Sequence, residues 1–202
     1  MDPTPIRILL IDDDEEDYVI TRGMLDQLDQ QHISLEWVAT YAEGKEALEA
    51  DDHDLYLLDY ILDERTGLDL LRELDQETCR SPVIMLTGKG NFTVDVDAMR
   101  LGVADYLDKA TVDPELLERT VRYVLDRLKS QRALQESEER HRSMFDHLPI
   151  GLFRCTPEGG FIDANPTLVR LLGYPDPEML EGTYAAGFYV GPSDRSHFLA
   201  AL

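Results

Sequence analysis

Four groups of polar residues stand where apolar segments end, and their types suit a shared chemistry. The acids at positions 12–14 follow the segment IRILLI, and Asp59 ends the segment DLYLLD. Thr87 ends PVIMLT, and Lys109 follows ADYLD. Carboxylates held close together repel one another, which raises the pKa of at least one of them unless a cation neutralises the group. Hard oxygen ligands with room for water suit Mg²⁺ or Mn²⁺. Such a centre supports phosphoryl transfer, with Asp59 as nucleophile and Lys109 and Thr87 on the phosphoryl oxygens.

These residues meet only if the apolar segments are parallel strands of one sheet. Five segments are too apolar to have one face in water, as is typical of buried parallel strands: residues 6–12, 33–40, 54–60, 81–88 and 104–109. Helical patterns separate them, at residues 15–30, 42–50, 67–77 and 92–102. We therefore predict an α/β fold with a doubly wound five-stranded parallel sheet over about residues 5–128, with its chemistry beyond the C-terminal strand ends.

A long helix is predicted after the sheet. Asp113 suits an N-cap and Pro114 the first helical position, and no Gly or Pro follows until Pro149. Its first half has the 4-3-4 spacing of a coiled-coil seam, at Leu117, Val121, Val124 and Leu128, and the next positions in phase are polar. The first half packs on the sheet or on a partner helix, and the rest is a solvated linker or a weak polar seam. Between these alternatives we predict a parallel dimeric helix.

The segment after Pro149 has a different character. It predicts a β-hairpin with its turn at residues 157–160 and then two short helices. Their expected starts are Asn165-Pro166 and Asp176-Pro177, and their expected ends are Gly173 and Gly182.

Composition excludes several classes of function. The net charge of −22 disfavours binding to nucleic acid or anionic lipid. No apolar run approaches the roughly 18 residues of a membrane span, and the N-terminus has no secretory pattern. Cys79 and Cys155 lie far apart and share no metal-ligand spacing. We therefore expect a cytoplasmic protein with reduced thiols, and we assign no cofactor-binding residues.

The segments LLIDDD, LYLLDYILDERTG, PVIMLTG and ADYLDK resemble, in order and spacing, the receiver domain of two-component response regulators. The resemblance covers about residues 5–128. It implies a regulator that catalyses only its own phosphorylation and dephosphorylation, with a histidine kinase or phosphotransfer protein as donor. The resemblance implies that Asp59 is the phosphoacceptor and a metal ligand. Asp13 would bind Mg²⁺ directly and Asp12 through water, and the Ile61 backbone carbonyl would be a further ligand. Thr87 and Tyr106 would form the switch pair, and Lys109 would pair with the phosphoryl group.

Three positions depart from the family pattern. Asp63 stands where the family often has proline, and it adds negative charge near the site. Ala110 stands where a proline usually follows the lysine in a cis bond; we expect a trans bond or a reshaped loop here. An apolar Ile61 beside the phosphoryl group is expected to shield it from water.

The segment after the long helix resembles the start of a PAS domain. The matching stretch is SEERHRSMFDHLPIGLFRCTPEGGFIDANPTLVRLLGY. We predict a receiver domain at 1–128, a linker helix at 113–147 continuous with the last receiver helix, and a partial PAS domain at 148–202. The linker is expected to relay the phosphorylation state to the PAS or output region. An incomplete sheet leaves an apolar face bare, so we expect a homodimer through the linker and the PAS segment.

Three other readings compete with this one. An aspartate-nucleophile phosphohydrolase usually has a second Asp two residues after the first, where this chain has Ile61. A dinucleotide-binding enzyme needs glycines after the first strand, where this chain has acids. A receiver-like dimerisation or scaffold module would act without phosphorylation, and the complete set of site residues argues against it.

Overall fold

The computed structural model describes residues 5–27, 33–74, 79–88, 101–156 and 160–180. The chain divides into two compact units, Met1–Gln131 and Arg132–Leu202. The helix predicted at residues 92–102 lies outside the described residues except for its last two positions, and so do residues 157–159 of the predicted hairpin turn.

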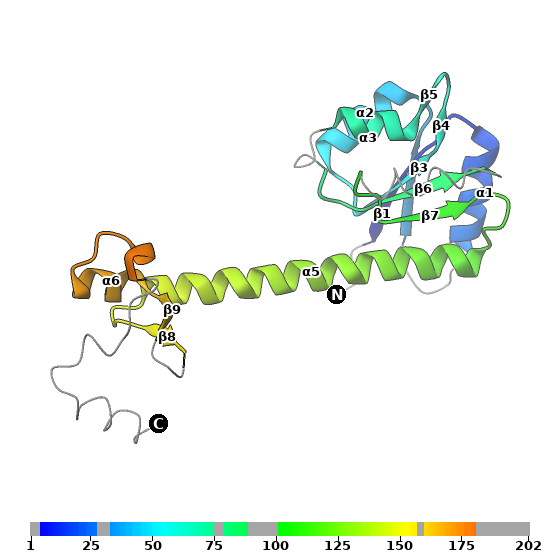
Figure 1. The fold of residues 1–202 in the computed structure, drawn as a ribbon. Helices are drawn as coiled ribbons and strands as arrows, with labels where there is room; N and C mark the ends of the chain where they lie inside the picture. Colours follow the sequence, from blue (N-terminus) through cyan, green and yellow to red (C-terminus); the bar gives the residue numbers. More distant parts are fainter. Residues whose placement is uncertain (1–4, 28–32, 75–78, 89–100, 157–159, 181–202) are drawn as a thin grey trace. The chain divides into compact units, whose positions relative to one another are not determined.

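The first unit contains the predicted parallel sheet (Figure 1). Its strands are β1 (Ile6–Ile11), β2 (Ile33–Val38), β3 (Leu55–Asp59), β6 (Val83–Thr87) and β7 (Asp105–Asp108). The order is β2-β1-β3-β6-β7, and every neighbouring pair is parallel. The order reverses direction between β1 and β3, and ligands bind doubly wound sheets at such a point. The fold class predicted from sequence is confirmed.

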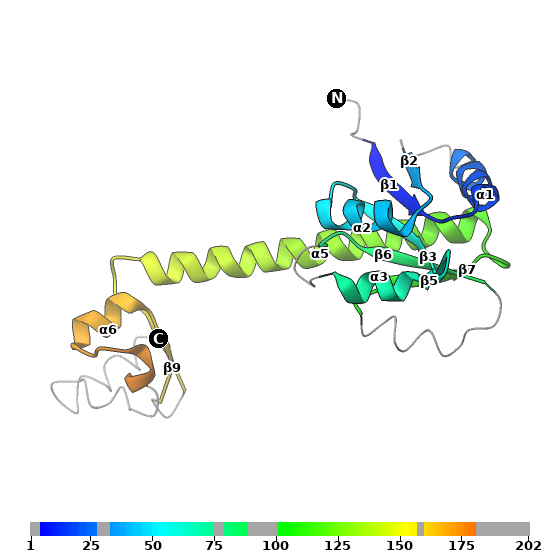
Figure 2. The same cartoon turned by 90° about the horizontal axis from the view of Figure 1, so that it is seen from above.

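Alternation along the strands builds one apolar core on each face of the sheet. On one face, Leu10 and Leu57 pack against helices α1 (Glu15–Asp26) and α5 (Pro114–His147). On the other, Ile11 and Leu58 pack against α2 (Tyr41–Ala50) and α3 (Gly67–Glu73). Figure 2 shows these helices from above. Helices on both faces explain why the central strands β1, β3 and β6 are mainly apolar rather than alternating with polar residues.

Helix α1 buries a different stripe from the one that its large apolar residues indicate. Val19 and Ile20 are 60% and 52% exposed, whereas Thr21 and Leu25 are buried. Val19 and Ile20 therefore stand at helical spacing without facing the core, and Leu28 lies outside the described residues. The start of the helix is fixed by Asp14, whose side chain accepts a hydrogen bond from the Glu16 N–H.

Helix α5 begins as predicted and runs to His147. The Asp113 carboxylate caps it by accepting from the Leu116 N–H at 2.7 Å. Leu117, Val121 and Val124 are buried in the core that contains β1, β3, β6 and β7. The first half of the helix therefore packs on the sheet, and residues 129–144 are exposed. No helix in the described parts of the chain is both long and apolar enough to cross a membrane.

The second unit contains the predicted hairpin and first helix. Strands β8 (Phe153–Cys155) and β9 (Phe161–Ala164) pair antiparallel, and helix α6 (Pro166–Leu172) follows. Gly173 ends α6 in the left-handed region at φ 78°. The second predicted helix is a 3₁₀ turn over Pro177–Leu180, and Gly182 lies outside the described residues.

Asn165 holds the second unit together from a fully buried position. Its Oδ1 accepts from the N–H groups of Leu152 and Leu168, both at 2.9 Å. Its Nδ2 donates to the carbonyls of Phe145 at 3.0 Å and Ile150 at 2.9 Å. One side chain thus satisfies backbone groups from the end of α5, the segment before β8 and the start of α6.

Asn165→Ala is expected to destabilise the second unit by about 2 kcal/mol, because it leaves buried backbone groups unpaired. The measurement is denaturant unfolding followed by far-UV circular dichroism. Trp37, the only tryptophan, lies in the first unit, and its fluorescence transition should stay unchanged. Thr167→Ala, which removes two exposed hydrogen bonds, one donated to the Leu148 carbonyl and one accepted from Arg170, is the control and should cost less than half as much.

Candidate functional site

Three carboxylates from two strand ends meet at the C-terminal edge of the sheet. Asp12 and Asp13 follow β1, and Asp59 is the last residue of β3, which pairs with β1. One carboxylate oxygen from each lies within 4.8 Å of the others. Asp12 is fully buried and Asp59 nearly so, whereas Asp13 is exposed. The structure thus brings together the three acids predicted as metal ligands.

Lys109 neutralises part of this cluster from the end of β7. Its Nζ lies 2.8 Å from Asp12 Oδ2 and 2.7 Å from Asp59 Oδ1. A third carboxylate, Asp17 Oδ2 on α1, lies 2.6 Å away. Sequence reasoning missed Asp17. The signal was its spacing, because Asp17, Thr21 and Leu25 lie at i, i+4 and i+8 on the stripe that α1 buries.

Burial dominates the electrostatics of the cluster. It raises the pKa of Asp59 to about 6, against the lowering effect of Lys109 and with a further rise from Asp12. Burial also raises the pKa of Asp12, although Lys109 and the Asp14 N–H oppose it. Burial by itself lowers the pKa of Lys109, but its hydrogen bonds to Asp12, Asp17 and Asp59 outweigh burial and hold that pKa above its usual value. The group carries more negative charge than one lysine balances.

An aromatic pair fixes the backbone at Asp12. The indole Nε1 of Trp37, on β2, donates to the Asp12 carbonyl at 2.8 Å. The ring of Tyr18, on α1, stacks on Trp37 with the ring centroids 4.9 Å apart. The Asp14 N–H donates to Asp12 Oδ1 at 3.0 Å. The only tryptophan is therefore bonded directly to the acidic cluster, and its fluorescence is expected to report changes there.

The stretch after Asp59 forms a small hairpin of β4 (Ile61–Leu62) and β5 (Arg65–Thr66). The Ile61 N–H donates to Asp59 Oδ2 at 3.2 Å, and the Ile61 side chain is 57% exposed. Asp63 lies between the two strands with φ 52°, and its N–H donates to Asp13 Oδ2 at 3.1 Å. Proline, common here in the family, can adopt neither that φ nor that hydrogen bond. Asp63 thus touches the cluster through its backbone.

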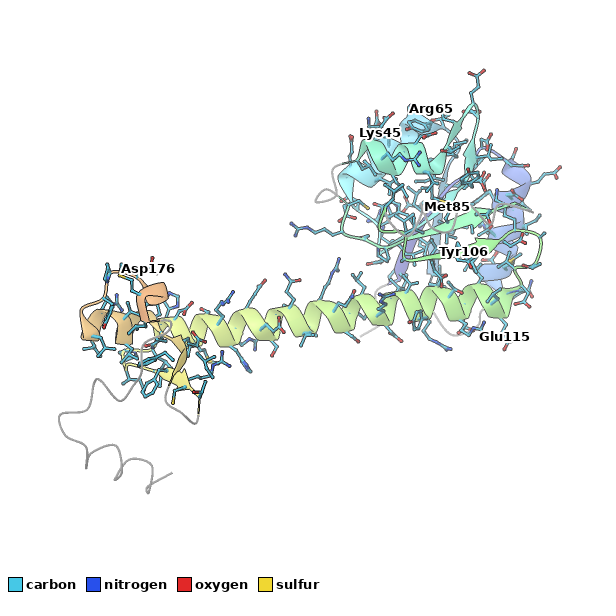
Figure 3. All side chains as sticks on the ribbon, viewed as in Figure 1. Lys45, Arg65, Met85, Tyr106, Glu115 and Asp176 are labelled. Atoms are coloured by element: carbon cyan, nitrogen blue, oxygen red, sulfur yellow. The ribbon has the colours of Figure 1, made fainter. Side chains whose placement is uncertain are left out.

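The hairpin is fixed at its far end. The Arg65 guanidinium lies 3.9 Å above the Tyr41 ring of α2 and pairs with Glu73 of α3, which also pairs with Lys45. Figure 3 labels Arg65 and Lys45. Gly67 begins α3, and a Cβ there would lie 2.3 Å from the Asp59 carbonyl oxygen. The backbone of α3 therefore approaches Asp59 as closely as only glycine allows.

The predicted switch residues lie on neighbouring strands. Thr87 ends β6 and is half-buried, and its Oγ1 donates to the Leu107 carbonyl at 3.5 Å. Tyr106, on β7, is in register with buried Met85 and is itself 44% exposed (Figure 3). The described residues contain no cis peptide bond, so the bond before Ala110 is trans. A trans bond was one of the two outcomes expected where alanine replaces the family's proline.

A family model for the response regulator receiver domain matches residues 8–121, more than half of the chain. The chain belongs to the response regulator receiver family. A model for a PAS domain matches residues 139–199. Residues 139–147 of that match are within helix α5, before the boundary predicted at 148.

Curated proteins and solved structures are similar to part of the chain. The transcriptional regulatory protein CpxR of Klebsiella pneumoniae is 40% identical over 121 residues, which cover 60% of this chain and 50% of CpxR. QseB of Escherichia coli is 38% identical, covering 52% of this chain and 46% of QseB. A CheY-like receiver domain from Methanospirillum hungatei has a TM-score of 0.56 and 26% identity, covering 63% of this chain and 99% of that structure. The chain spans about half the length of the curated relatives it matches.

Proposed function

We propose that the first unit accepts a phosphoryl group on Asp59 in two-component signalling. One observation carries the proposal: Lys109 Nζ lies 2.7 Å from Asp59 Oδ1, inside a cluster that also holds Asp12 and Asp13. The Asp59 carboxylate, which is the proposed nucleophile, and the Lys109 ammonium, which is the proposed partner of the transferred group, are therefore already in contact. The receiver family match supports the same assignment.

The proposed donor is a phosphorylated histidine of a kinase or phosphotransfer protein. A carboxylate oxygen of Asp59 attacks phosphorus, the new O–P bond forms, and the N–P bond breaks with its electron pair passing to the imidazole. Phosphoryl transfer depends mainly on positioning and charge neutralisation. Lys109 and the Thr87 hydroxyl are proposed to hold phosphoryl oxygens. At neutral pH Asp59 is mostly ionised despite its raised pKa of about 6, so the nucleophile is available.

The acidic cluster fits a hard divalent cation. Its ligand atoms lie within 4.8 Å of one another, all are carboxylate oxygens, and one lysine leaves them with excess negative charge. Asp13 and Asp59 are proposed as direct ligands of Mg²⁺ or Mn²⁺, with Asp12 acting through water and the Ile61 carbonyl as a further ligand. When bound, the cation would neutralise charge on the phosphoryl oxygens.

We further propose how phosphorylation of Asp59 is transmitted to other parts of the chain. Thr87 and Tyr106 are proposed to shift together on phosphorylation, which alters the surface around β7. Because α5 packs on the same sheet and continues to His147, its position is proposed to relay the state toward the PAS region. The domain limits at 1–128, 113–147 and 148–202, a homodimer through the linker and PAS segments, and a cytoplasmic location belong to the same proposal.

The test is incubation with acetyl phosphate and Mg²⁺, followed by intact mass measurement. The parent protein is expected to gain one phosphoryl mass, and Asp59→Asn is expected to gain none. Asp52→Asn, which removes an exposed acid from the opposite end of β3, is the control and should behave as the parent does. No gain in the parent would contradict the proposal and favour a scaffold module that acts without phosphorylation.

Asp63→Pro is expected to weaken Mg²⁺ binding about tenfold, because it removes the N–H that orients the Asp13 carboxylate. The measurement is titration with Mg²⁺, followed by Trp37 fluorescence. Asp63→Gly keeps both the N–H and the positive φ, so it should bind Mg²⁺ as the parent does. Equal affinity in the proline variant would show that the hydrogen bond does not position Asp13.

A further inference from the structure

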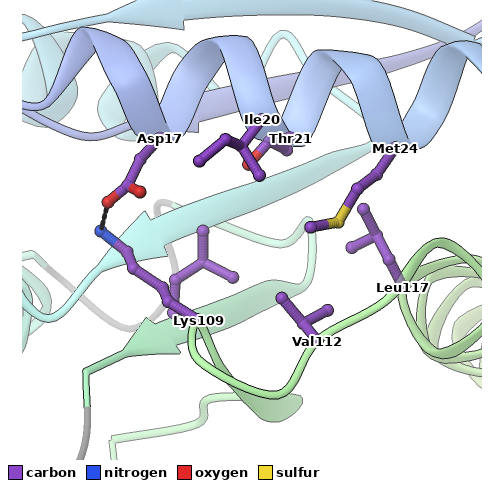
Figure 4. Close-up of a pocket in the computed structure, with 8 residues that line it drawn as sticks. Asp17, Ile20, Thr21, Met24, Lys109, Val112 and Leu117 are labelled. Atoms are coloured by element: carbon purple, nitrogen blue, oxygen red, sulfur yellow. Dashed lines mark hydrogen bonds and ion pairs between the residues drawn. The ribbon is translucent and has the colours of Figure 1, made fainter.

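Helix α1 contributes a fourth carboxylate to the phosphorylation site. Asp17 Oδ2 lies 2.6 Å from Lys109 Nζ, as close as either Asp12 or Asp59 (Figure 4). The Lys109 ammonium donates hydrogen bonds to Asp12 and Asp17 and forms an ion pair with Asp59. A phosphoryl oxygen that binds Lys109 must therefore compete with these carboxylates.

The surroundings of Asp17 make this contact strong for a partly exposed pair. Its side chain is 30% exposed, and it lies at the edge of a small cavity with apolar walls. The lining residues include Met24, Leu86, Val112 and Leu117, and Figure 4 shows Asp17 and Lys109 bridging the cavity from α1 to the end of β7. Apolar walls reduce the screening of an ion pair by water. Asp17 also stands in the first turn of α1, where the helix dipole stabilises its negative charge.

The two other partners of Lys109 are not equivalent to Asp17. Phosphorylation converts the Asp59 carboxylate into an acyl phosphate and moves its negative charge onto the phosphoryl oxygens. Asp12 is buried and remains fixed by its hydrogen bond from the Asp14 N–H. Asp17 is the partly exposed partner, so it is the one that can turn toward water when a phosphoryl oxygen binds Lys109, and the ion pair that it gives up opposes phosphorylation.

We propose that Asp17 is a positioning residue that competes with the phosphoryl group for Lys109 and so limits the phosphorylated fraction of the protein. The inference rests on the proposed function of Asp59. Two effects act in the same direction. Asp17 takes one N–H donor of Lys109, and its negative charge repels the phosphoryl oxygens that form beside it.

The experiment compares four single variants of the full chain with the parent. Each is incubated with acetyl phosphate and Mg²⁺ to a steady state, and the ratio of phosphorylated to unphosphorylated protein is measured by intact mass. Asp17→Asn and Asp17→Ser are expected to raise that ratio about threefold to tenfold. Asp17→Glu keeps the charge and should stay close to the parent. Glu16→Gln removes one exposed acid from the same turn of α1 and is the matched control.

The outcomes separate the inference from the proposed function. A parent that gains no phosphoryl mass overturns both. A phosphorylated parent with an unchanged or lower ratio in Asp17→Asn and Asp17→Ser overturns the role of Asp17 alone. An equal rise in Glu16→Gln would assign the effect to general charge and would also overturn it. Unfolding followed by Trp37 fluorescence confirms that each variant is folded. If Asp17→Asn is not folded, Asp17→Ser takes its place in the comparison.

Discussion

Asp59→Asn is expected to raise the free energy of unfolding of the first unit by about 3 kcal/mol at pH 8 without divalent cations. Burial raises the pKa of Asp59 from its ordinary value of 3.8 to about 6. A difference of about two pKa values corresponds to about 3 kcal/mol of preference for the neutral side chain. Asparagine is neutral and has the same shape, so it removes this cost while it abolishes phosphorylation.

The pH dependence gives this prediction its sign. Between about pH 4 and pH 6 the folded protein binds more protons at Asp59 than the unfolded chain does, so its stability falls as pH rises. Below pH 4 the side chain is protonated in both states, and the variant should gain little over the parent. Above pH 6 it is ionised in both states, and the full difference should appear.

Chemical denaturation in EDTA, followed by Trp37 fluorescence at pH 4.5, 6 and 8, measures the effect on the first unit alone. Added Mg²⁺ is expected to stabilise the parent more than the variant, because the cation offsets the repulsion that asparagine has already removed. A variant that is less stable than the parent at pH 8 would show that the Lys109 ion pair outweighs burial at Asp59.

Most of the fold and the acidic site could be predicted because they depend on patterns within single segments. Apolar strands that end at acids predict both a buried parallel sheet and the edge where those acids meet. Asp12 and Asp13 follow one strand directly, Asp59 ends a second, and Lys109 follows a third. Their separation along the chain does not matter, because parallel strands place all their C-terminal ends on one edge.

The features that sequence reasoning missed depend on backbone geometry or on a choice between helix faces. Asp17 stands on a helix whose large apolar residues, Val19 and Ile20, are exposed and indicate the wrong face. Asp63 was judged by its side-chain charge, but its φ of 52° and its N–H make the contact. The spacing of Leu117, Val121 and Val124 left packing on the sheet and packing on a partner helix both open, because either use needs the same spacing, and the structure shows packing on the sheet.

Lys109→Met is expected to cost the first unit about 4 kcal/mol at pH 8 in EDTA. The substitution leaves the carboxylates of Asp12, Asp17 and Asp59 without their shared cation, and two of these are buried. Removing one partner of a buried ion pair typically costs 3–5 kcal/mol, because the remaining charge has neither water nor a counterion. The cost should be smaller at pH 5, since the stranded carboxylates can then take up protons. Mg²⁺ should restore part of the loss.

Lys45→Met is the matched control, because it also removes a lysine from an ion pair. Lys45 pairs with Glu73 at 3.0 Å on the surface, with both side chains more than a third exposed, so its loss should cost less than about 1 kcal/mol. Combining Lys109→Met with Asp59→Asn tests the contact directly. Without the lysine, the negative charge on Asp59 is less well balanced. Asp59→Asn should therefore stabilise the Lys109→Met variant by more than it stabilises the parent. If the stability changes caused by Lys109→Met and by Asp59→Asn simply added, Lys109 and Asp59 would not be coupled in the metal-free protein. The 2.7 Å contact between them would then not be what stabilises the ionised Asp59 carboxylate.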